Sequence, residues 1–247
     1  MMMHGFLGIW ADIREDMASE WYRWHSEEHM AERVAIPGFL AGRRYDIVDE
    51  RLAARAPDSR RIQHCYMMYE GAALTTFNSD PYLERLNNPT PWTRAMAPAF
   101  QNFARGACEL ASTSGDGYGG FLLLMRFDEG GREADLSAAS IDALDHFVET
   151  LPGLQGVTAA HFGFCRPEIT DVDTAEKKTR TATSEQQFGS ALLIEGYDLA
   201  FLIKHFPAIE ANLKAIGLPA DRARYGFYAL SNLLTERTTE EANKRHD

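Results

Sequence analysis

Short apolar runs and longer amphipathic segments alternate along the first half of the chain. Runs of strand length lie at 5–13, 39–48, 62–69 and 103–111. Segments of helical length lie at 16–35 and 72–101; Asp16 is a candidate cap for the first, and Pro37-Gly38 follows its end. This order, β-α-β-β-α-β, predicts a ferredoxin-like unit.

The second half repeats this order together with several short motifs. Its predicted strands lie at 119–127, 154–166, 188–195 and 222–233, and its predicted helices at 136–150 and 198–216. Four landmarks recur in sequence: Gly5-Phe6-Leu7 as Gly120-Phe121-Leu122, Ile36-Pro37-Gly38-Phe39 as Leu151-Pro152-Gly153-Leu154, Glu70-Gly71 as Glu195-Gly196, and Arg105-Gly106 as Tyr225-Gly226. Their offsets, about 115, 115, 125 and 120 residues, are typical of a duplicated unit whose loops have changed length.

We therefore predict an α+β fold of two tandem ferredoxin-like repeats, at 1–113 and 118–235, followed by a charged tail at 236–247. A small polar linker at 112–117 separates the two repeats. Each four-stranded sheet has one face under its helices and one bare face. The two bare faces are expected to meet, closing an intramolecular pseudo-twofold barrel with the helices outside.

Two segments interrupt the apolar pattern. Residues 51–61 are charged and contain the turn-forming Pro57-Asp58-Ser59, which predicts a hairpin excursion. Residues 171–187 are polar and lack apolar periodicity, which predicts a mobile hairpin loop that is a candidate lid.

Composition narrows the class of partner. The chain has 247 residues, a hydrophobic fraction of 45% and a net charge of −11. This acidity argues against nucleic acid and an anionic membrane surface, which both require a basic face. No apolar run approaches the ~20 residues of a membrane helix, no signal-peptide pattern is present, and the three cysteines are widely spaced. We expect a cytoplasmic protein with a small-molecule partner and, through exposed strand edges, a possible homodimer.

One face of the first predicted helix carries unusual chemistry. At 100° per residue this face gathers aromatic, imidazole and carboxylate groups: Trp21, Tyr22, Trp24, His25, Glu28, His29 and Glu32. The corresponding second-half segment, 140–146, lacks this aromatic cluster. Polar groups on a face that packs against a sheet must be paired, hydrated or functional.

Three interpretations of this cluster stay open. In the first, Glu28 and Glu32 bond the two histidines and form a satisfied polar seam. In the second, a His/Glu pair transfers protons in a pocket between helix and sheet. In the third, His25 and His29, spaced i, i+4, bind a metal ion with a glutamate as third ligand, although the zincin pattern His-Glu-x-x-His is absent.

The predicted strands add further candidates. Arg43 and Tyr45 alternate with Arg44, so one side of the strand offers a cation and a phenol for an anionic oxygen. Neutralisation of nearby acids is an equally good interpretation of the two arginines. His64 on the next strand is a candidate lining residue. No phosphate-binding glycine loop and no Gly-x-Ser-x-Gly elbow occurs, and a haem-ligating histidine remains open.

The stretch from Trp21 to Tyr45 resembles the EthD-like branch of the dimeric α/β-barrel superfamily. The resemblance rests on Trp21-Tyr22, Glu28-His29-Met30, Glu32-Arg33, Ile36-Pro37-Gly38-Phe39 and Arg43-Arg44-Tyr45. It implies a barrel of paired ferredoxin-like units, with His29 at the recurrent histidine and Tyr22, Glu28, Arg33 and Arg44 near it. Leu144 aligns with His29, so at most one such site per chain is expected.

Members of that superfamily include cofactor-free monooxygenases, isomerases, cyclases, dehydratases and haem-handling enzymes, so fold does not decide reaction. We expect a cofactor-independent enzyme of isomerase, lyase or cyclase type that acts on a small hydrophobic oxygenated metabolite, aromatic or polyketide-like, by His-mediated proton transfer. The predicted catalytic residues are His29, Glu28, His25 and Arg44. The predicted substrate-binding residues are Trp21, Tyr22, Trp24, Glu32, Arg43, Tyr45 and His64. A monooxygenase, cofactor-free or haem- or metal-dependent, and a non-catalytic ligand-binding barrel are the alternatives.

Overall fold

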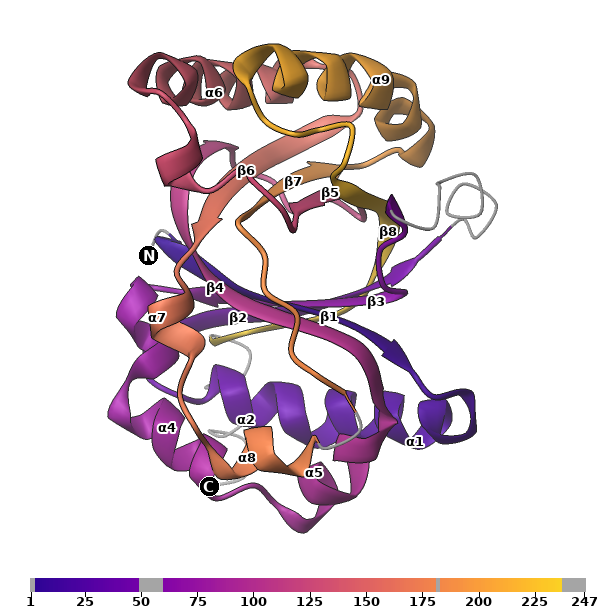
Figure 1. Cartoon of the computed structure of the whole chain (residues 1–247). Helices are drawn as coiled ribbons and strands as arrows, with labels where there is room; N and C mark the ends of the chain where they lie inside the picture. Colours follow the sequence, from indigo (N-terminus) through magenta and orange to yellow (C-terminus); the bar gives the residue numbers. More distant parts are fainter. Residues whose placement is uncertain (1–2, 49–59, 181–182, 237–247) are drawn as a thin grey trace.

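Eight antiparallel strands close into a barrel in the computed structural model, which describes residues 3–48, 60–180 and 183–236 (Figure 1). The strands are β1 (Gly5–Ile13), β2 (Phe39–Ile47), β3 (Cys65–Gly71), β4 (Phe100–Gly115), β5 (Phe121–Phe127), β6 (Val157–Cys165), β7 (Ser190–Gly196) and β8 (Arg224–Thr235). Their order around the barrel is β1-β3-β2-β8-β5-β7-β6-β4. The α+β class and the barrel are therefore confirmed.

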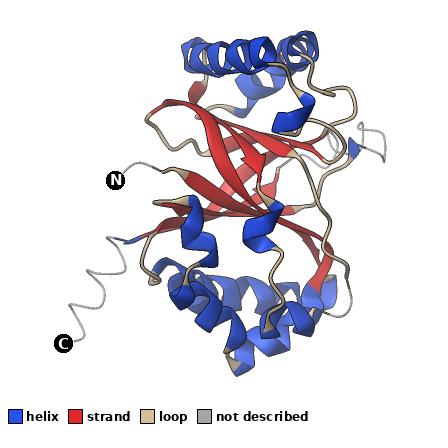
Figure 2. Cartoon of the chain, turned by 60° about the vertical axis from the view of Figure 1, so that its left-hand side comes forward, coloured by secondary structure: helices blue, strands red, loops and turns tan. Residues whose placement is uncertain are grey.

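Helices cover the barrel on two opposite sides (Figures 1 and 2). The first layer contains η1 (Glu15–Met17), α1 (Ala18–Trp24), η2 (His25–His29), α2 (Met30–Val34), η4 (Leu74–Asn78), α4 (Asp80–Asn87), α5 (Pro91–Met96) and η5 (Ala97–Ala99). The second layer contains α6 (Ala138–Thr150) and α9 (Leu199–Ile216), with the short turns η6 (Glu133–Asp135) and η7 (Leu151–Gly153) nearby. Two further short helices, α7 (Pro167–Thr170) and α8 (Ala175–Thr179), leave the second half and lie on the first layer.

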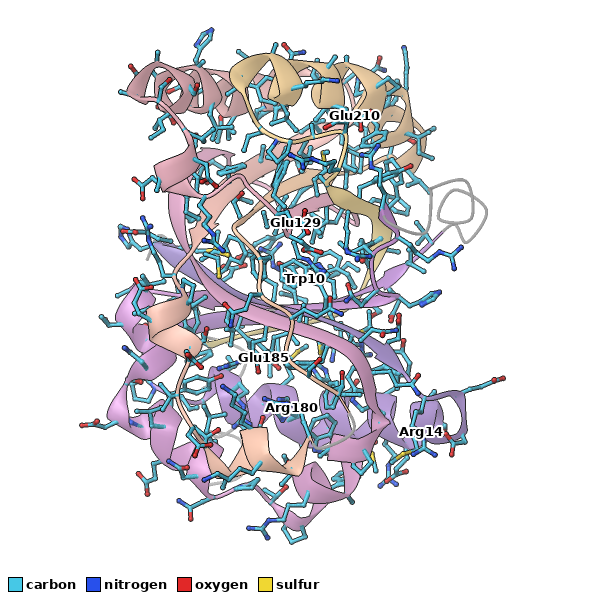
Figure 3. All side chains as sticks on the ribbon, viewed as in Figure 1. Trp10, Arg14, Glu129, Arg180, Glu185 and Glu210 are labelled. Atoms are coloured by element: carbon cyan, nitrogen blue, oxygen red, sulfur yellow. The ribbon has the colours of Figure 1, made fainter. Side chains whose placement is uncertain are left out.

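Strand alternation sorts apolar side chains into three cores. On β1, Leu7 and Ala11 pack against the first helix layer, whereas Phe6 and Trp10 fill the barrel interior, where Figure 3 labels Trp10. The second helix layer closes over its own strands with another apolar core, which includes Leu144 of α6. Both faces of the sheet are thus buried, which explains why the strands read as continuous apolar runs.

The predicted linker at 112–117 is partly strand. β4 continues to Gly115 because Ser112–Gly115 completes a ladder with β6, in which Thr113 pairs with His161. Every strand of the described chain also has two neighbours, so the exposed edges expected to support a homodimer are absent from it. The homodimer itself stays a prediction.

The strand pairing changes how the repeated Gly-Phe-Leu motif aligns between the two halves, by one residue. Phe6 lies opposite Glu70 and Leu122 lies opposite Glu195, so Phe6 corresponds to Leu122 and not to Phe121. A one-residue slip matters because it sends every side chain of a strand to the other face. Matching Gly-Phe-Leu to Gly-Phe-Leu would therefore have exchanged the barrel interior with the helix side.

The first helix ends where Pro37-Gly38 predicts, at Val34, and Gly38 has a φ of +91°, which glycine adopts readily. Its start differs from the prediction. Asp16 lies inside the η1 turn and pairs with Arg14 instead of capping α1, whose N-cap is Met17. The predicted hairpin at 51–61 and the tail at 236–247 lie almost wholly outside the described residues. Among the described helices, none is both long and apolar enough to cross a membrane.

Candidate active site

A small cavity lies between the first helix layer and the sheet. Aromatic and aliphatic side chains form most of its wall: Ile9, Trp24, Met67, Tyr69, Tyr82, Ala97, Phe100 and Phe103. Polar groups complete it: His25, His29, Arg33, Thr93, Arg105, Glu176, Thr179 and Arg180. Its free volume is about 30 Å³, room for roughly two water molecules. An organic ligand therefore requires the walls to move.

The two histidines are placed by an irregularity in the first helix. Residues His25–His29 form a single π turn between α1 and α2. Such turns are rare and occur often at functional sites, because the extra residue reorients the side chains that follow. Here the π turn begins and ends at the two imidazoles, whose ring centroids are 5.6 Å apart.

His25 is fixed by its surroundings on every side. Its ring stacks on Trp21 at a centroid distance of 5.1 Å. The Arg44 guanidinium, always a donor, lies 3.4 Å from Nδ1, so the ring proton belongs on Nε2, which faces the Tyr69 hydroxyl at 3.4 Å. Burial lowers the pKa of His25 well below its usual range, and the charges of His29 and Arg44 act in the same direction.

His29 is less constrained. Its ring lies 4.3 Å from the Trp24 ring, between centroids, and its Nδ1 atom is buried with no hydrogen-bond partner. Burial lowers the pKa of His29 well below its usual range, and repulsion from Arg33 and Arg180 lowers it further. At neutral pH His29 is therefore a neutral imidazole with a free ring nitrogen beside the cavity.

Three arginines converge on the same cavity from separate parts of the chain. Arg33 comes from α2, Arg105 from β4, and Arg180 follows α8. Arg33 donates to the Glu176 carboxylate at 2.5 Å, and Arg180 approaches the same residue at 3.3 Å. Figure 3 shows Arg180 and Glu185 on the segment that crosses from the second half. Sequence inspection predicted a mobile loop at 171–187, but this segment contains α8 and packs against the first layer.

The two predicted glutamates do not bond the histidines. Glu28 accepts a hydrogen bond from the Thr90 hydroxyl at 2.6 Å, and Glu32 pairs with Arg85 at 3.2 Å. Neither carboxylate lines the cavity. The polar seam of paired His and Glu is therefore not the arrangement seen, and the partner of His29 proposed from sequence is not beside it.

Other predicted residues surround the cavity without lining it. Trp21 is buried behind His25, and the Tyr22 hydroxyl donates to Asp46 at 2.5 Å. Arg44 stacks over the Tyr22 ring at 4.7 Å and reaches His25 from behind. These residues contact the side chains of the cavity wall and do not themselves line the cavity.

Three predicted substrate-binding residues lie elsewhere. Arg43 and Tyr45 point into the barrel, where Arg43 pairs with Glu195 at 2.6 Å and Glu70 at 2.7 Å. Strand alternation separates them from Arg44, and it is the Arg44 side that faces the helices. His64 is exposed and pairs with Asp12 at 2.8 Å, also away from the cavity.

The structure adds polar residues that sequence inspection did not select: Tyr69, Tyr82, Arg105, Glu176 and Arg180. Their positions span more than 100 residues, so only barrel closure brings them together. Arg33 was named through the family motif alone. The repeated motif could have pointed to Arg105. The first half has Arg105-Gly106 where the second half has Tyr225-Gly226, so this arginine is present in one half only.

Among the described residues, the cavity as it stands offers neither a metal site of three protein ligands nor room for a haem group. No group of three or more His, Cys, Asp or Glu side chains among them is placed to hold a metal ion. The free space beside His29, about 30 Å³, is smaller than a porphyrin and also smaller than a single aromatic ring, so either group would require the walls to move. We therefore derive no chemical step through either group.

Comparison with known proteins identifies the fold. No protein-family model matches this chain, and no curated protein matches it in sequence. An anthrone oxidase-like protein matches it with a TM-score of 0.59 and 9% identity, over 94% of this chain and 92% of its own. A protein from Fusobacterium nucleatum, provisionally assigned as a monooxygenase, gives 0.57 and 11%, over 95% and 96%.

A third structure, from Lactobacillus acidophilus NCFM and assigned in the same provisional way, gives a TM-score of 0.51 and 12% identity, over 95% and 97% of the two chains. At such identities the likeness shows the fold alone, a ferredoxin-like α/β barrel that spans nearly the whole chain.

Proposed function

We propose that this protein is an enzyme that abstracts a proton from a small, oxygenated aromatic or polyketide-like substrate bound in the first-half cavity. One observation carries the proposal: a neutral imidazole with an unpartnered nitrogen shares an aromatic-walled cavity with desolvated guanidinium groups. Proton abstraction next to a carbonyl needs a base and a stabiliser of the resulting oxyanion. This cavity offers both.

His29 is the proposed base. Its lowered pKa makes it a weak base in the empty cavity, but an enolate formed beside it would stabilise the imidazolium by direct charge attraction. Base strength would therefore rise along the reaction coordinate. His25, held by Trp21, Arg44 and Tyr69, is proposed as a positioning group that carries the Tyr69 hydroxyl toward the cavity.

Arg105 is the proposed stabiliser of the developing oxyanion. It is 8% exposed, and its Nη2 atom donates to the Tyr82 hydroxyl at 3.2 Å. A guanidinium out of bulk water interacts more strongly with a nearby anion than one on the surface, because less solvent screens the attraction. Arg105 and the Tyr82 phenol would share the charge of the enolate oxygen.

Oxygenation of the carbanion is a second candidate. It is favoured by the names of the three similar structures, which are anthrone oxidase-like or provisionally monooxygenases. For anthrone, loss of the proton at C10 followed by reaction with O₂ would give anthraquinone and water, with both oxygen atoms of O₂ accounted for. The same base would begin either reaction, and no added cofactor is part of this proposal.

We also propose that the chain is a tandem duplication with pseudo-twofold symmetry, of EthD-like descent. Support comes from the strand order. The first four strands lie side by side as β4-β1-β3-β2 and the last four in the equivalent order β8-β5-β7-β6. The two sets join at the equivalent contacts β2–β8 and β6–β4. All three cysteines are free, in keeping with the cytoplasmic location that we propose.

The test uses anthrone and its ring-carboxylated derivative as probes. Under argon in ²H₂O, the wild-type protein should accelerate deuterium incorporation at C10, measured by NMR, and His29→Gln should reduce this acceleration to near background. In air, anthraquinone formation then separates oxygenation from simple proton transfer. Equal exchange of both probes by wild type and His29→Gln, with both proteins folded by circular dichroism, would refute the role of His29.

A further inference from the structure

The carboxylate of Glu176 occupies a position of interest in the cavity wall. It belongs to α8, between β6 and β7 of the second half, yet it bonds Arg33 of the first half at 2.5 Å. Glu176 is 12% exposed and Arg33 is 3% exposed, so this is a nearly buried ion pair. The wall of the cavity thus contains a position at which the Arg33 guanidinium binds a carboxylate, here that of Glu176.

Arginines outnumber carboxylates around the described cavity. Arg33, Arg105 and Arg180 face Glu176 from the wall and Glu185 just behind it. The shortest separation between Arg105 and Glu185 is 3.9 Å, so that pair is loose. The Nη1 atom of Arg33 is buried with no hydrogen-bond partner. One positive charge and one buried donor are therefore left for a ligand.

The free volume shows how a ligand must enter. About 30 Å³ admits water but no aromatic ring, so part of the wall must leave. Helix α8 is the part that we expect to move, because it spans only Ala175–Thr179 and ion pairs, a hydrogen bond and a cation–π contact tie it to the first layer. These ties include a bond from the Ala175 amide to Asn87 and the stacking of Arg180 on Phe103 at 4.5 Å.

We propose that Glu176 is an internal stand-in for the substrate's carboxylate, and that a small aromatic carboxylate displaces it from Arg33 and Arg180 as α8 moves aside. This proposal rests on the proposed function and specifies its substrate class. The ring would lie against Trp24 and Phe100, and the bound carboxylate would direct the reacting carbon toward His29. Arg105 would remain available for the enolate oxygen.

Guanidinium chemistry supports a carboxylate over a neutral ligand. A planar guanidinium binds a carboxylate through two parallel hydrogen bonds, and a charged pair is roughly twice as strong as a neutral one. A neutral ligand that displaced Glu176 would leave Arg33 buried without a counter-charge, which is costly. The cavity therefore selects a ligand that replaces the charge it removes.

Titration calorimetry with benzoate and its neutral analogue benzamide tests the proposal. Glu176→Gln removes the internal competitor and should bind benzoate about tenfold more tightly than wild type, or better. Benzamide should bind weakly to both proteins. Glu168→Gln is the matched control, because it removes an exposed carboxylate from α7, outside α8, and should leave benzoate affinity unchanged.

Two further variants complete the design. Arg33→Gln combined with Glu176→Gln should lose the gain in benzoate affinity, because the receiving guanidinium is gone. If Glu176→Gln is too unstable to titrate, Glu185→Gln removes the neighbouring carboxylate and should shift benzoate affinity in the same direction. Benzoate binding that is unchanged in Glu176→Gln, or equal to benzamide binding, overturns the proposal.

Failure of this proposal and failure of the proposed function give different results. Benzoate binding depends on Glu176 and Arg33 and needs no turnover. Deuterium exchange depends on His29. If Glu176→Gln binds benzoate more tightly but exchange does not depend on His29, the anion site stands and the role of His29 as base is refuted. If exchange depends on His29 but benzoate affinity does not depend on Glu176, the role of His29 stands and the anion site is refuted.

Discussion

The two helix layers solve the same packing problem with different side chains. By the sequence offsets, His29, Arg33 and Tyr69 of the first half correspond to Leu144, Val148 and Ile194 of the second. The three second-half residues are at most 1% exposed and belong to one apolar core. A layer of this shape can therefore be closed with hydrocarbon alone.

The comparison shows that the polar groups of the first layer are not needed to build the fold. A buried neutral imidazole or a buried charged guanidinium loses its hydrogen bonds to water, whereas a buried leucine has none to lose. These polar groups therefore lower the stability of the fold unless protein partners replace all of those hydrogen bonds. The unpartnered atoms of His29 and Arg33 show that pairing is incomplete. Incomplete pairing is what a site that awaits a ligand should show.

The largest expected effect is on the exchange rate and comes from replacing His29 with leucine, the residue at the corresponding position 144 of the second half. His29→Leu should lower the rate of deuterium exchange by about a hundred- to ten-thousand-fold, as loss of a general base does. Its free energy of unfolding should stay level or rise by about 1 kcal/mol, because an unpaired buried nitrogen is removed. Exchange kinetics and urea denaturation measure the two quantities. A large loss of stability would mean that His29 is structural.

The reciprocal substitution should affect stability instead. Leu144→His places an imidazole in a core without a partner and removes a buried leucine side chain. We expect a loss of about 3 kcal/mol in the free energy of unfolding and no change in exchange rate per folded molecule. If urea denaturation shows that His29→Leu and Leu144→His lower the free energy of unfolding equally, His29 is as necessary for packing as Leu144. The proposed difference between the two layers would then be wrong.

A smaller effect appears in the pH dependence of stability. His25 and His29 have lowered pKa values in the folded protein, so below about pH 6.5 the unfolded chain binds more protons than the folded one. Stability should therefore fall as pH falls from 6.5, by up to about 1.4 kcal/mol per pH unit for each histidine. Between pH 7.5 and 5, the stability of His29→Leu should therefore fall less steeply than that of wild type, by the contribution of one histidine, up to about 1.4 kcal/mol per pH unit.

The barrel provides an internal reference for this measurement. Burial alone would raise the pKa of Glu195, but Arg43 and neighbouring hydrogen bonds lower it to about 2. Its contribution is complete above the unfolded value and is lost only between about pH 4.5 and pH 2. Loss of stability above pH 5 therefore reports on the histidines and not on this carboxylate.

Local sequence patterns were sufficient for much of the fold. Short apolar runs and Pro37-Gly38 located β1, β2 and the end of the first helix within a few residues, because these signals depend on neighbours in the chain. The extension of β4 to Gly115 depends instead on β6, which is far away in sequence. A small polar segment looks like a linker until its pairing partner is known.

The site was predictable only in part for the same reason. Wheel geometry selected His25, His29 and Trp24, which line the cavity. It also selected Glu28 and Glu32, which bond other residues, and it had no means of anticipating the π turn. Alternation correctly separated Arg43 and Tyr45 from Arg44, but it could not tell which of the two sides would face the helices and the cavity. Glu176 and Arg180 come from the other half and carry no local signal.

The crossing of α8 from one half to the other bears on why the halves are joined. In a dimer of identical chains every substitution appears twice, so a helix that shields one cavity would be copied over the other. Covalent fusion frees each half to diverge. In the tandem duplication that we propose, one half can carry the polar cavity while the other half supplies the helix that covers it, which two identical chains could do only in duplicate.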